Sequence, residues 1–253
     1  MNPLVFSVFI FVLVFGGALA GLTVRRWLPA HHQDAETKDA VKLVLGLIAT
    51  VAALVLSLLI VSAHDAYDRR ESEVRQLGAH LAQLDRVLAG YGPEASEIRA
   101  QLRRLVEAEL AQFWPDPGIA PTSTPASENL IRGQVIYESL AALVPRVEAQ
   151  RFAQQRALQL AIAMDDTRRL LYEQAGGSLA WPFFVVLVFW LVMLFFGFSL
   201  YARRNATVIL TFLVGALTVA GAVFLILELH RPFSGLMQIS SAPIRNALMQ
   251  IGR

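Results

Sequence analysis

The sequence contains no cysteine, and it has few charged residues. Without cysteine, disulfide bonds, thiolate nucleophiles and cysteine-ligated zinc are all excluded. Charged residues make up 17% of the chain, the formal net charge is only +2, and no stretch is rich in Lys or Arg. Because nucleic-acid-binding proteins carry a basic patch, we expect no nucleic-acid partner.

Common enzyme motifs are also missing. The chain has no Gly-rich phosphate loop and no set of nucleophile, base and orienting residue at a familiar spacing. Asp165 and Asp166, in "AMDDTRR", fit a solvated helix face better than a catalytic carboxylate pair. We therefore expect no catalytic activity and no cofactor.

Hydrophobic residues are abundant, at 55% of the chain with a mean hydropathy of +0.51. They gather in four blocks, 3–22, 41–62, 180–201 and 206–229. A bilayer core about 30 Å thick needs roughly 20 apolar residues per helix, so each block predicts a transmembrane span. "ALA" at 18–20 resembles a signal-peptidase site, but the residues before it lack a basic region, which favours a retained span.

The fold class that this pattern predicts is all-α: a polytopic membrane protein with a helical extramembrane domain, since no strand pattern or repeat occurs. We expect four regions: spans 1 and 2 with their polar loop over 1–62, the extramembrane domain over 63–179, spans 3 and 4 over 180–229, and a C-terminal tail over 230–253.

The predicted extramembrane domain is mildly acidic, with 16 Asp or Glu and 13 Arg between residues 64 and 179. An apolar seam at steps of three and four residues extends the second span outward as a helix: Val74, Leu77, Leu81, Leu84 and Leu88. "GYGP" at 90–93 should end it. Further helices are predicted over 94–113, 127–144 with Ser127 as N-cap, and 145–174.

Orientation in the membrane stays open. Basic residues of the short connections outnumber those of the termini and favour a cytoplasmic location for these connections: Arg25, Arg26, Lys38, Arg203 and Arg204 against Arg231, Arg245 and Arg253. Counting the arginines that flank the long domain (Arg69, Arg70, Arg75, Arg168 and Arg169) reverses the result.

The connection "LPAHHQDAETKD", 28–39, brings two histidines close to three carboxylates. His31 and His32 are adjacent, whereas histidines that share a zinc ion on a helix are usually four residues apart. A polar connecting loop between two spans explains the segment better. Pro29 would interrupt the helix, and Asp39 would lie near the positive N-terminal end of the next helix. We therefore predict no metal site.

One face of the second span carries small and hydroxyl-bearing residues, at helical steps of three and four: Lys42, Gly46, Thr50, Ala53 and Ser57, with His64 seven residues on. Hydroxyl groups and bare backbone can line a hydrated path for ions. Small residues also allow close helix packing, the commoner role, and both interpretations remain open. Gly17-x-x-x-Gly21 in the first span, and Ala216, Ala220 and Gly221 in the fourth, predict close packing.

The end of the fourth span holds Glu228, with Arg231 three residues later and then Pro232. An ionisable group at the membrane edge is costly unless it is paired, which points to a functional role. An ion pair that anchors the helix end before Pro232 stops it is an equally good interpretation.

Four segments, in order, resemble a bacterial family of membrane proteins described as bestrophin-like: 25–68, "EQAGGSLAWPFFVVLVFWL" (173–191), "ARRNATV" (202–208) and "LILELHRPFSGLMQISSAPIRNAL" (225–248). Two positions depart from the family pattern. His64 stands where members usually have Lys, and His230 stands where they usually have Asp.

The resemblance implies a homo-oligomeric, multi-pass protein of the bacterial inner membrane that acts as an ion channel for inorganic anions, with the second span lining the pore. It also implies that both termini and the helical domain lie in the cytosol, against the short-connection charge count. The competing hypothesis is a non-conducting scaffold or sensor whose helical domain binds a partner.

Overall fold

The computed structural model describes residues 2–27, 35–115, 126–175 and 181–251. Every regular element in these ranges is a helix, so the predicted all-α class is confirmed. The helices are α1 (Pro3–Val24), α2 (Ala35–Tyr91), α3 (Ser96–Phe113), α4 (Ala126–Ala141), α5 (Glu148–Ala175), α6 (Trp181–Tyr201), α7 (Ala206–Leu229) and α8 (Ala242–Gln250). Short 3₁₀ turns lie at Arg25–Trp27 (η1) and Pro93–Ala95 (η3).

Four helical segments are long and apolar enough to cross a membrane, as predicted: Pro3–Trp27, Lys38–Tyr91, Pro182–Tyr201 and Ala206–Leu229. The helix α2 is 57 residues long. Because roughly 20 residues cross a bilayer, most of α2 must lie outside the hydrocarbon core.

The chain divides into two compact units. We call residues 1–67 and 178–231 the membrane unit, and residues 68–177 and 232–253 the polar unit. The second unit therefore includes the C-terminal residues as well as the segment between the second and third spans.

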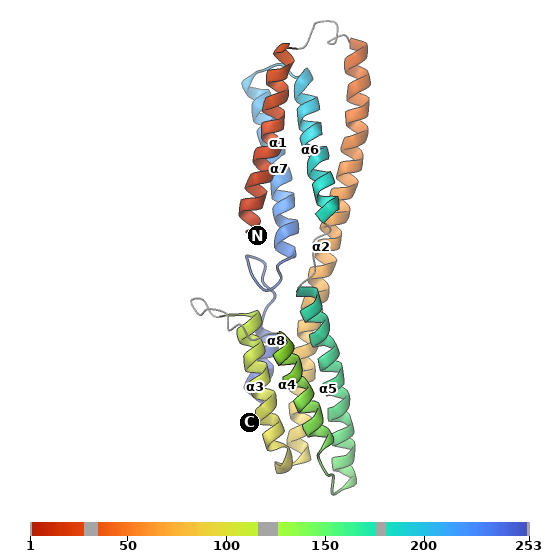
Figure 1. The fold of residues 1–253 in the computed structure, drawn as a ribbon, viewed down its shortest axis with the longest axis vertical. Coiled ribbons are helices and arrows are strands. Elements are labelled where there is room, and N and C mark those ends of the chain that lie inside the picture. Colours follow the sequence, from red (N-terminus) through yellow and green to blue (C-terminus); the bar gives the residue numbers. More distant parts are fainter. Residues whose placement is uncertain (1, 28–34, 116–125, 176–180, 252–253) are drawn as a thin grey trace. The chain divides into compact units, whose positions relative to one another are not determined.

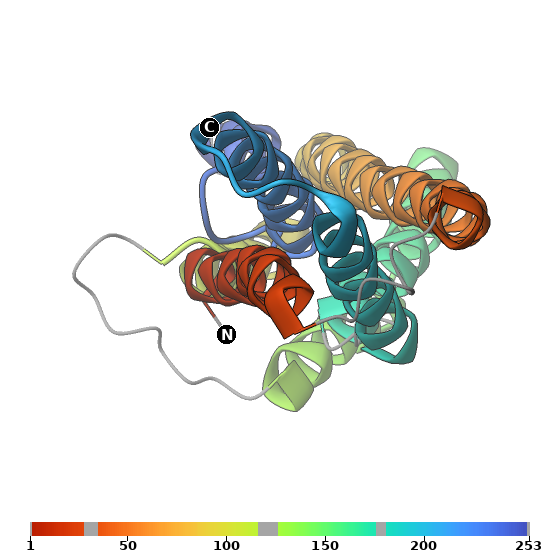
Figure 2. The same cartoon turned by 90° about the horizontal axis from the view of Figure 1, so that it is seen from above.

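In the membrane unit, α1 packs closely against α6 and α7, and α6 lies between α1 and the first part of α2 (Figures 1 and 2). Gly17 and Gly21 make the contact with α6 possible. A Cβ atom added at Gly21 would lie 2.5 Å from the carbonyl oxygen of Phe196, and one at Gly17 would lie 3.1 Å from Val192 Cγ1. The predicted close-packing role of this pair is confirmed.

The small residues of α7 follow the prediction only in part. Ala216 and Ala220 are buried. Gly221 is exposed, and nothing lies within 4 Å of a Cβ atom built on it, so it packs against no described helix of its own chain.

In the polar unit, the rest of α2 packs with α3, α4, α5 and α8 (Figure 1). The predicted seam Val74, Leu77, Leu81, Leu84 and Leu88 is buried throughout. Arg99 of α3 donates two hydrogen bonds to the buried Asp85 of α2, at 2.7 and 3.0 Å. This paired geometry fixes the register between the two helices.

Two predicted helix ends need correction. The helix α4 begins at Ala126, so Ser127 lies inside the helix and not at the predicted N-cap position. The next helix begins at Glu148 rather than at 145, and α4 stops at Ala141. Between them, the backbone N–H of Arg146 donates to Gln150 Oε1 at 2.7 Å. A side chain of α5 thus provides the hydrogen-bond acceptor that a longer helix would otherwise supply.

The C-terminal segment is part of the core of the polar unit. The backbone N–H of Ile239 donates to Pro232 O at 2.7 Å, and Trp114 Nε1–H donates to Ile239 O at 2.8 Å. The ring of Phe233 lies 4.9 Å from that of Phe113 and 5.2 Å from that of Trp114. Residues 232–251 thus form a closed loop followed by a docked helix.

Candidate functional site

The stripe on the second span occupies an exposed face of α2. Lys42, Gly46, Thr50, Ala53 and Ser57 are all exposed within the chain. A Cβ atom built on Gly46 meets nothing within 4 Å. The described part of the membrane unit therefore leaves this face uncovered.

The helix presents three faces in the membrane unit. Leu45, Ala52 and Ala63 form the buried face, and Leu45 contacts α6 beside Gly197. Large exposed leucines form a second face: Leu43, Leu47, Leu54 and Leu58. By helical geometry these leucines lie next to the stripe, which is the third face.

Local hydrogen bonds define the chemistry of the stripe. The Thr50 hydroxyl donates to Gly46 O at 3.0 Å, so its oxygen keeps lone pairs that can accept. Lys42 Nζ lies 3.2 Å from Asp39 Oδ1, and both side chains are more than half exposed. Such a pair contributes about 0–1 kcal/mol, so Lys42 can readily exchange Asp39 for another anion.

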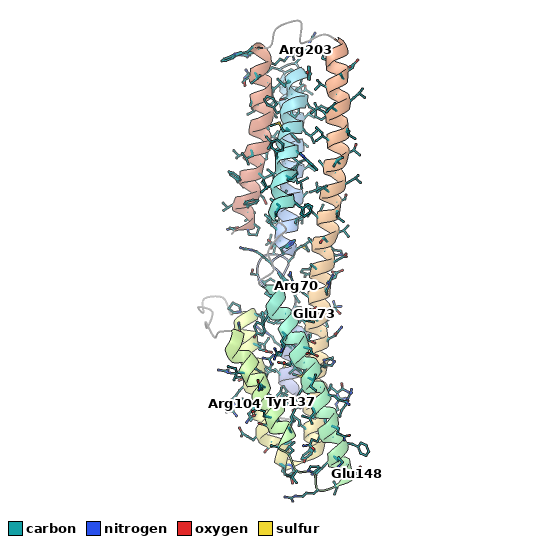
Figure 3. All side chains as sticks on the ribbon, turned by 45° about the vertical axis from the view of Figure 1, so that its right-hand side comes forward. Arg70, Glu73, Arg104, Tyr137, Glu148 and Arg203 are labelled. Atoms are coloured by element: carbon teal, nitrogen blue, oxygen red, sulfur yellow. The ribbon has the colours of Figure 1, made fainter. Side chains whose placement is uncertain are left out.

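Basic residues gather where α1 and α6 end. Arg25 donates to the carbonyl oxygen of Ala202, which ties η1 to the residue that follows α6. Arg203, labelled in Figure 3, and Arg204 are exposed at the same connection. His31 and His32 lie outside the described residues. Among the residues that are described, no group of three potential metal ligands comes together.

At the end of α7, Glu228 is buried and Arg231 is half-buried. The N–H of Arg231 donates to the backbone oxygen of Glu228 at 2.9 Å. His230 Nδ1 lies 2.8 Å from Ile226 O, and because a carbonyl can only accept, this nitrogen carries the proton. His230 therefore caps the last turn of α7, while Pro232 is buried in the polar unit. His64 lies on an exposed face of α2.

Sequence reasoning missed a buried ion pair in the polar unit. Arg168 of α5 donates to Glu109 of α3, and both side chains are almost fully buried. Burial raises the pKa of Glu109, while the charge and hydrogen bond of Arg168 act in the opposite direction. The position of Glu109 on the apolar face of α3, among Leu102, Leu105 and Leu110, was a usable signal. Asp165 is half-buried between Arg168 and Arg169 rather than fully solvated.

Four apolar spans, with one of them extended into a polar helical unit, define a polytopic α-helical membrane protein. The family model described as "Bestrophin-like domain" matches residues 11–244, and the chain belongs to this family. No curated protein matches the chain.

Solved structures share the fold. A point mutant of a bacterial bestrophin homologue from Klebsiella pneumoniae is similar with a TM-score of 0.71 at 12% identity, covering 97% of this chain and 99% of that chain. The homologue from the same organism phased by Zn-SAD has a TM-score of 0.71 at 10% identity, with 96% of each chain covered. At such identities the likeness establishes the fold, whereas residue roles must come from this chain.

Proposed function

We propose that the chain assembles into a homo-oligomeric ion channel of the bacterial inner membrane, which conducts small inorganic anions along the stripe of α2. It acts as a channel and not as an enzyme. Membership of the Bestrophin-like family supports this proposal, since the resemblance carries the expectation of ion conduction.

The observation that carries the proposal is the uncovered stripe on a membrane-spanning helix. The leucine face of α2 suits lipid tails, and the buried face is occupied by α6. A face of glycine, alanine and hydroxyl groups gains little from lipid but tolerates water. In a ring of copies, the stripes would face the symmetry axis and together line one path.

The residues of the stripe have distinct roles in this mechanism. Thr50 and Ser57 supply hydroxyl groups that rotate to donate to a passing anion, with Thr50 giving up its bond to Gly46 O. Lys42, which forms an exposed pair with Asp39, raises the local anion concentration at one mouth.

Conduction by purified full-length protein in planar bilayers tests this function. Wild-type protein should give currents whose reversal potential follows the chloride gradient, and the double variant Thr50→Leu, Ser57→Leu should abolish them. Val51→Leu is the matched control, because Val51 is exposed on the same helix outside the stripe. Full conduction by the double variant, with oligomers intact, would place the path elsewhere.

A scaffold or sensor is the second candidate, favoured by exposed apolar side chains in the polar unit. Val144, Val147 and Phe152 are 80%, 58% and 64% exposed. The three residues are near one another in the sequence, and apolar groups that form one exposed patch are typical of interaction surfaces. If intact wild-type oligomers carry no current at any voltage, this function is favoured. Phe152→Ser should then impair the activity of the protein in cells, whereas the stripe variants should not.

A further inference from the structure

A hollow of about 310 Å³ lies between α3 and α4 in the polar unit. Six described residues line it: Gln101, Arg104, Leu105, Arg132, Val135 and Ile136. On each helix the three residues are spaced i, i+3 and i+4, so each helix turns one face toward the hollow. Its volume is at the lower end of the range of small-molecule sites, about 300–1,000 Å³.

The floor of the hollow is apolar. Leu105 and Ile136 are buried, whereas Val135 is 45% exposed although it lies beside them. An apolar group of a ligand placed here would cover Val135 and remove apolar surface from water.

The rim is cationic and rich in donors. Arg104 and Arg132 bring two guanidinium groups, which favour carboxylate and phosphate oxygens. The Ser139 hydroxyl donates to Val135 O at 2.8 Å and also lies 3.3 Å from Gln101 Oε1, and the NH₂ group of Gln101 can donate to a ligand. Figure 3 marks Arg104 on α3 and Tyr137, the residue after Ile136, on α4.

Arg104 also contacts a carboxylate of its own helix. Its Nη2 lies 2.7 Å from Glu97 Oε1, and the two side chains are 64% and 71% exposed. Exposed pairs of this kind are weak, so a ligand carboxylate that also contacts the floor can replace Glu97. Glu97 therefore competes with any anion that binds in the hollow.

We propose that this hollow binds an amphipathic organic anion, with a carboxylate held by Arg104 and Arg132 and a compact aromatic or short aliphatic body on Leu105, Val135 and Ile136. An inorganic anion would leave the apolar floor uncovered. A partner helix needs anchors over two or more turns, whereas the hollow is limited to about one turn of each helix. The site is independent of ion conduction along α2.

Titration of full-length protein in lipid nanodiscs with 4-(trifluoromethyl)benzoate, followed by ¹⁹F NMR, tests the site. Binding should saturate and weaken as the salt concentration rises. The matched uncharged probe, 4-(trifluoromethyl)benzyl alcohol, should bind about tenfold more weakly because it lacks the carboxylate.

Variants assign the binding to the hollow. Arg104→Gln and Arg132→Gln should each weaken binding about three- to tenfold, and Glu97→Gln should strengthen it by removing the competing carboxylate. Val135→Trp should abolish binding by filling the hollow. Arg156→Gln, at an exposed arginine of α5, should leave binding unchanged. Because all five positions are exposed, the variants should elute and melt like wild type.

Three outcomes would overturn the proposal. One is equal binding of acid and alcohol, which would indicate partitioning into lipid. Another is unchanged affinity in both arginine variants. The third is a wild-type protein that does not bind the probe. If Arg104→Gln and Arg132→Gln also reduce the oligomer size, the hollow is a contact between copies of the chain.

Discussion

Gly16, Gly17 and Gly21 belong to one helix but meet different surroundings. A Cβ atom at Gly16 has nothing within 4 Å, whereas one at Gly21 would overlap Ser199 Oγ and press on the backbone of α6. Side-chain atoms can move away from such an overlap, but the Phe196 carbonyl can move only with its helix. The contact between α1 and α6 therefore depends on the missing side chain at Gly21.

We predict that Gly21→Ala destabilises the protein by about 1–3 kcal/mol, the usual cost of overpacking. Gly16→Ala is the control and should be neutral or stabilising by up to about 1 kcal/mol, since alanine favours a helix. Thermal unfolding of both variants in detergent measures the difference. Equal melting temperatures would show that α1 and α6 are not in close contact at Gly21.

The buried pair Glu109–Arg168 should be strongly sensitive to loss of one partner. Glu109→Ala breaks the buried pair and leaves Arg168 with the more distant Asp165, at 3.9 Å, so we expect a loss near the lower end of about 3–5 kcal/mol. Glu107→Ala on the same helix is the control, because its pair with Arg103 is about half exposed and should cost less than about 1 kcal/mol. Chemical unfolding of the full chain compares the two, and similar losses would argue against a buried pair.

Glu109 should also give the stability a pH dependence. Since burial raises its pKa in the folded protein, the unfolded chain loses this proton first, from about pH 4.3 upward. The stability of wild type relative to Glu109→Gln should therefore be greatest below that pH, fall as the pH rises to the folded pKa, and stay constant above it. An increase with pH in unfolding experiments would mean that Arg168 outweighs burial.

At the scale of elements, the seam of α2 was predictable because its apolar residues repeat with helical spacing over several turns. The helix α8 was not. Its nine residues are too short to be stable alone, and its contacts come from distant positions, such as Gly78 of α2, and from α3. The prediction that α5 begins at Pro145 was wrong for a similar reason. The hydrogen bond from the Arg146 backbone N–H to the Gln150 side chain cannot be identified from residue spacing.

The ring of Phe233 should be essential for docking of the C-terminal segment. Because Phe233 is half-buried, Phe233→Ala, which removes ring contacts with Phe113 and Trp114, should cost about 1–3 kcal/mol. Leu236→Ala is the control, because Leu236 is 81% exposed. Limited proteolysis should release the C-terminal segment from Phe233→Ala faster than from wild type or the control. Equal cleavage rates would contradict this role.

At the scale of the whole molecule, the four spans followed from the apolar blocks, since the bilayer sets a minimum length. The surroundings of Thr50 and Ser57 could not be predicted from the sequence. Their spacing indicates that they share a face, but that face is uncovered in one chain, so its neighbours belong to the assembly. The buried Glu109 was overlooked although its place on the apolar face of α3 was a signal, and its partner Arg168 on α5 could not be identified from spacing.

The absence of cysteine allows the central claim to be tested directly, because each single substitution introduces one thiol. In intact oligomers in lipid, Thr50→Cys and Ser57→Cys should react with a membrane-impermeant thiol reagent, whereas Leu54→Cys and Leu58→Cys on the neighbouring face should be protected. Labelling at 50 and 57 alone would mean that the stripe faces water. Protection at 50 and 57, or equal labelling at all four positions, would contradict an ion path along α2.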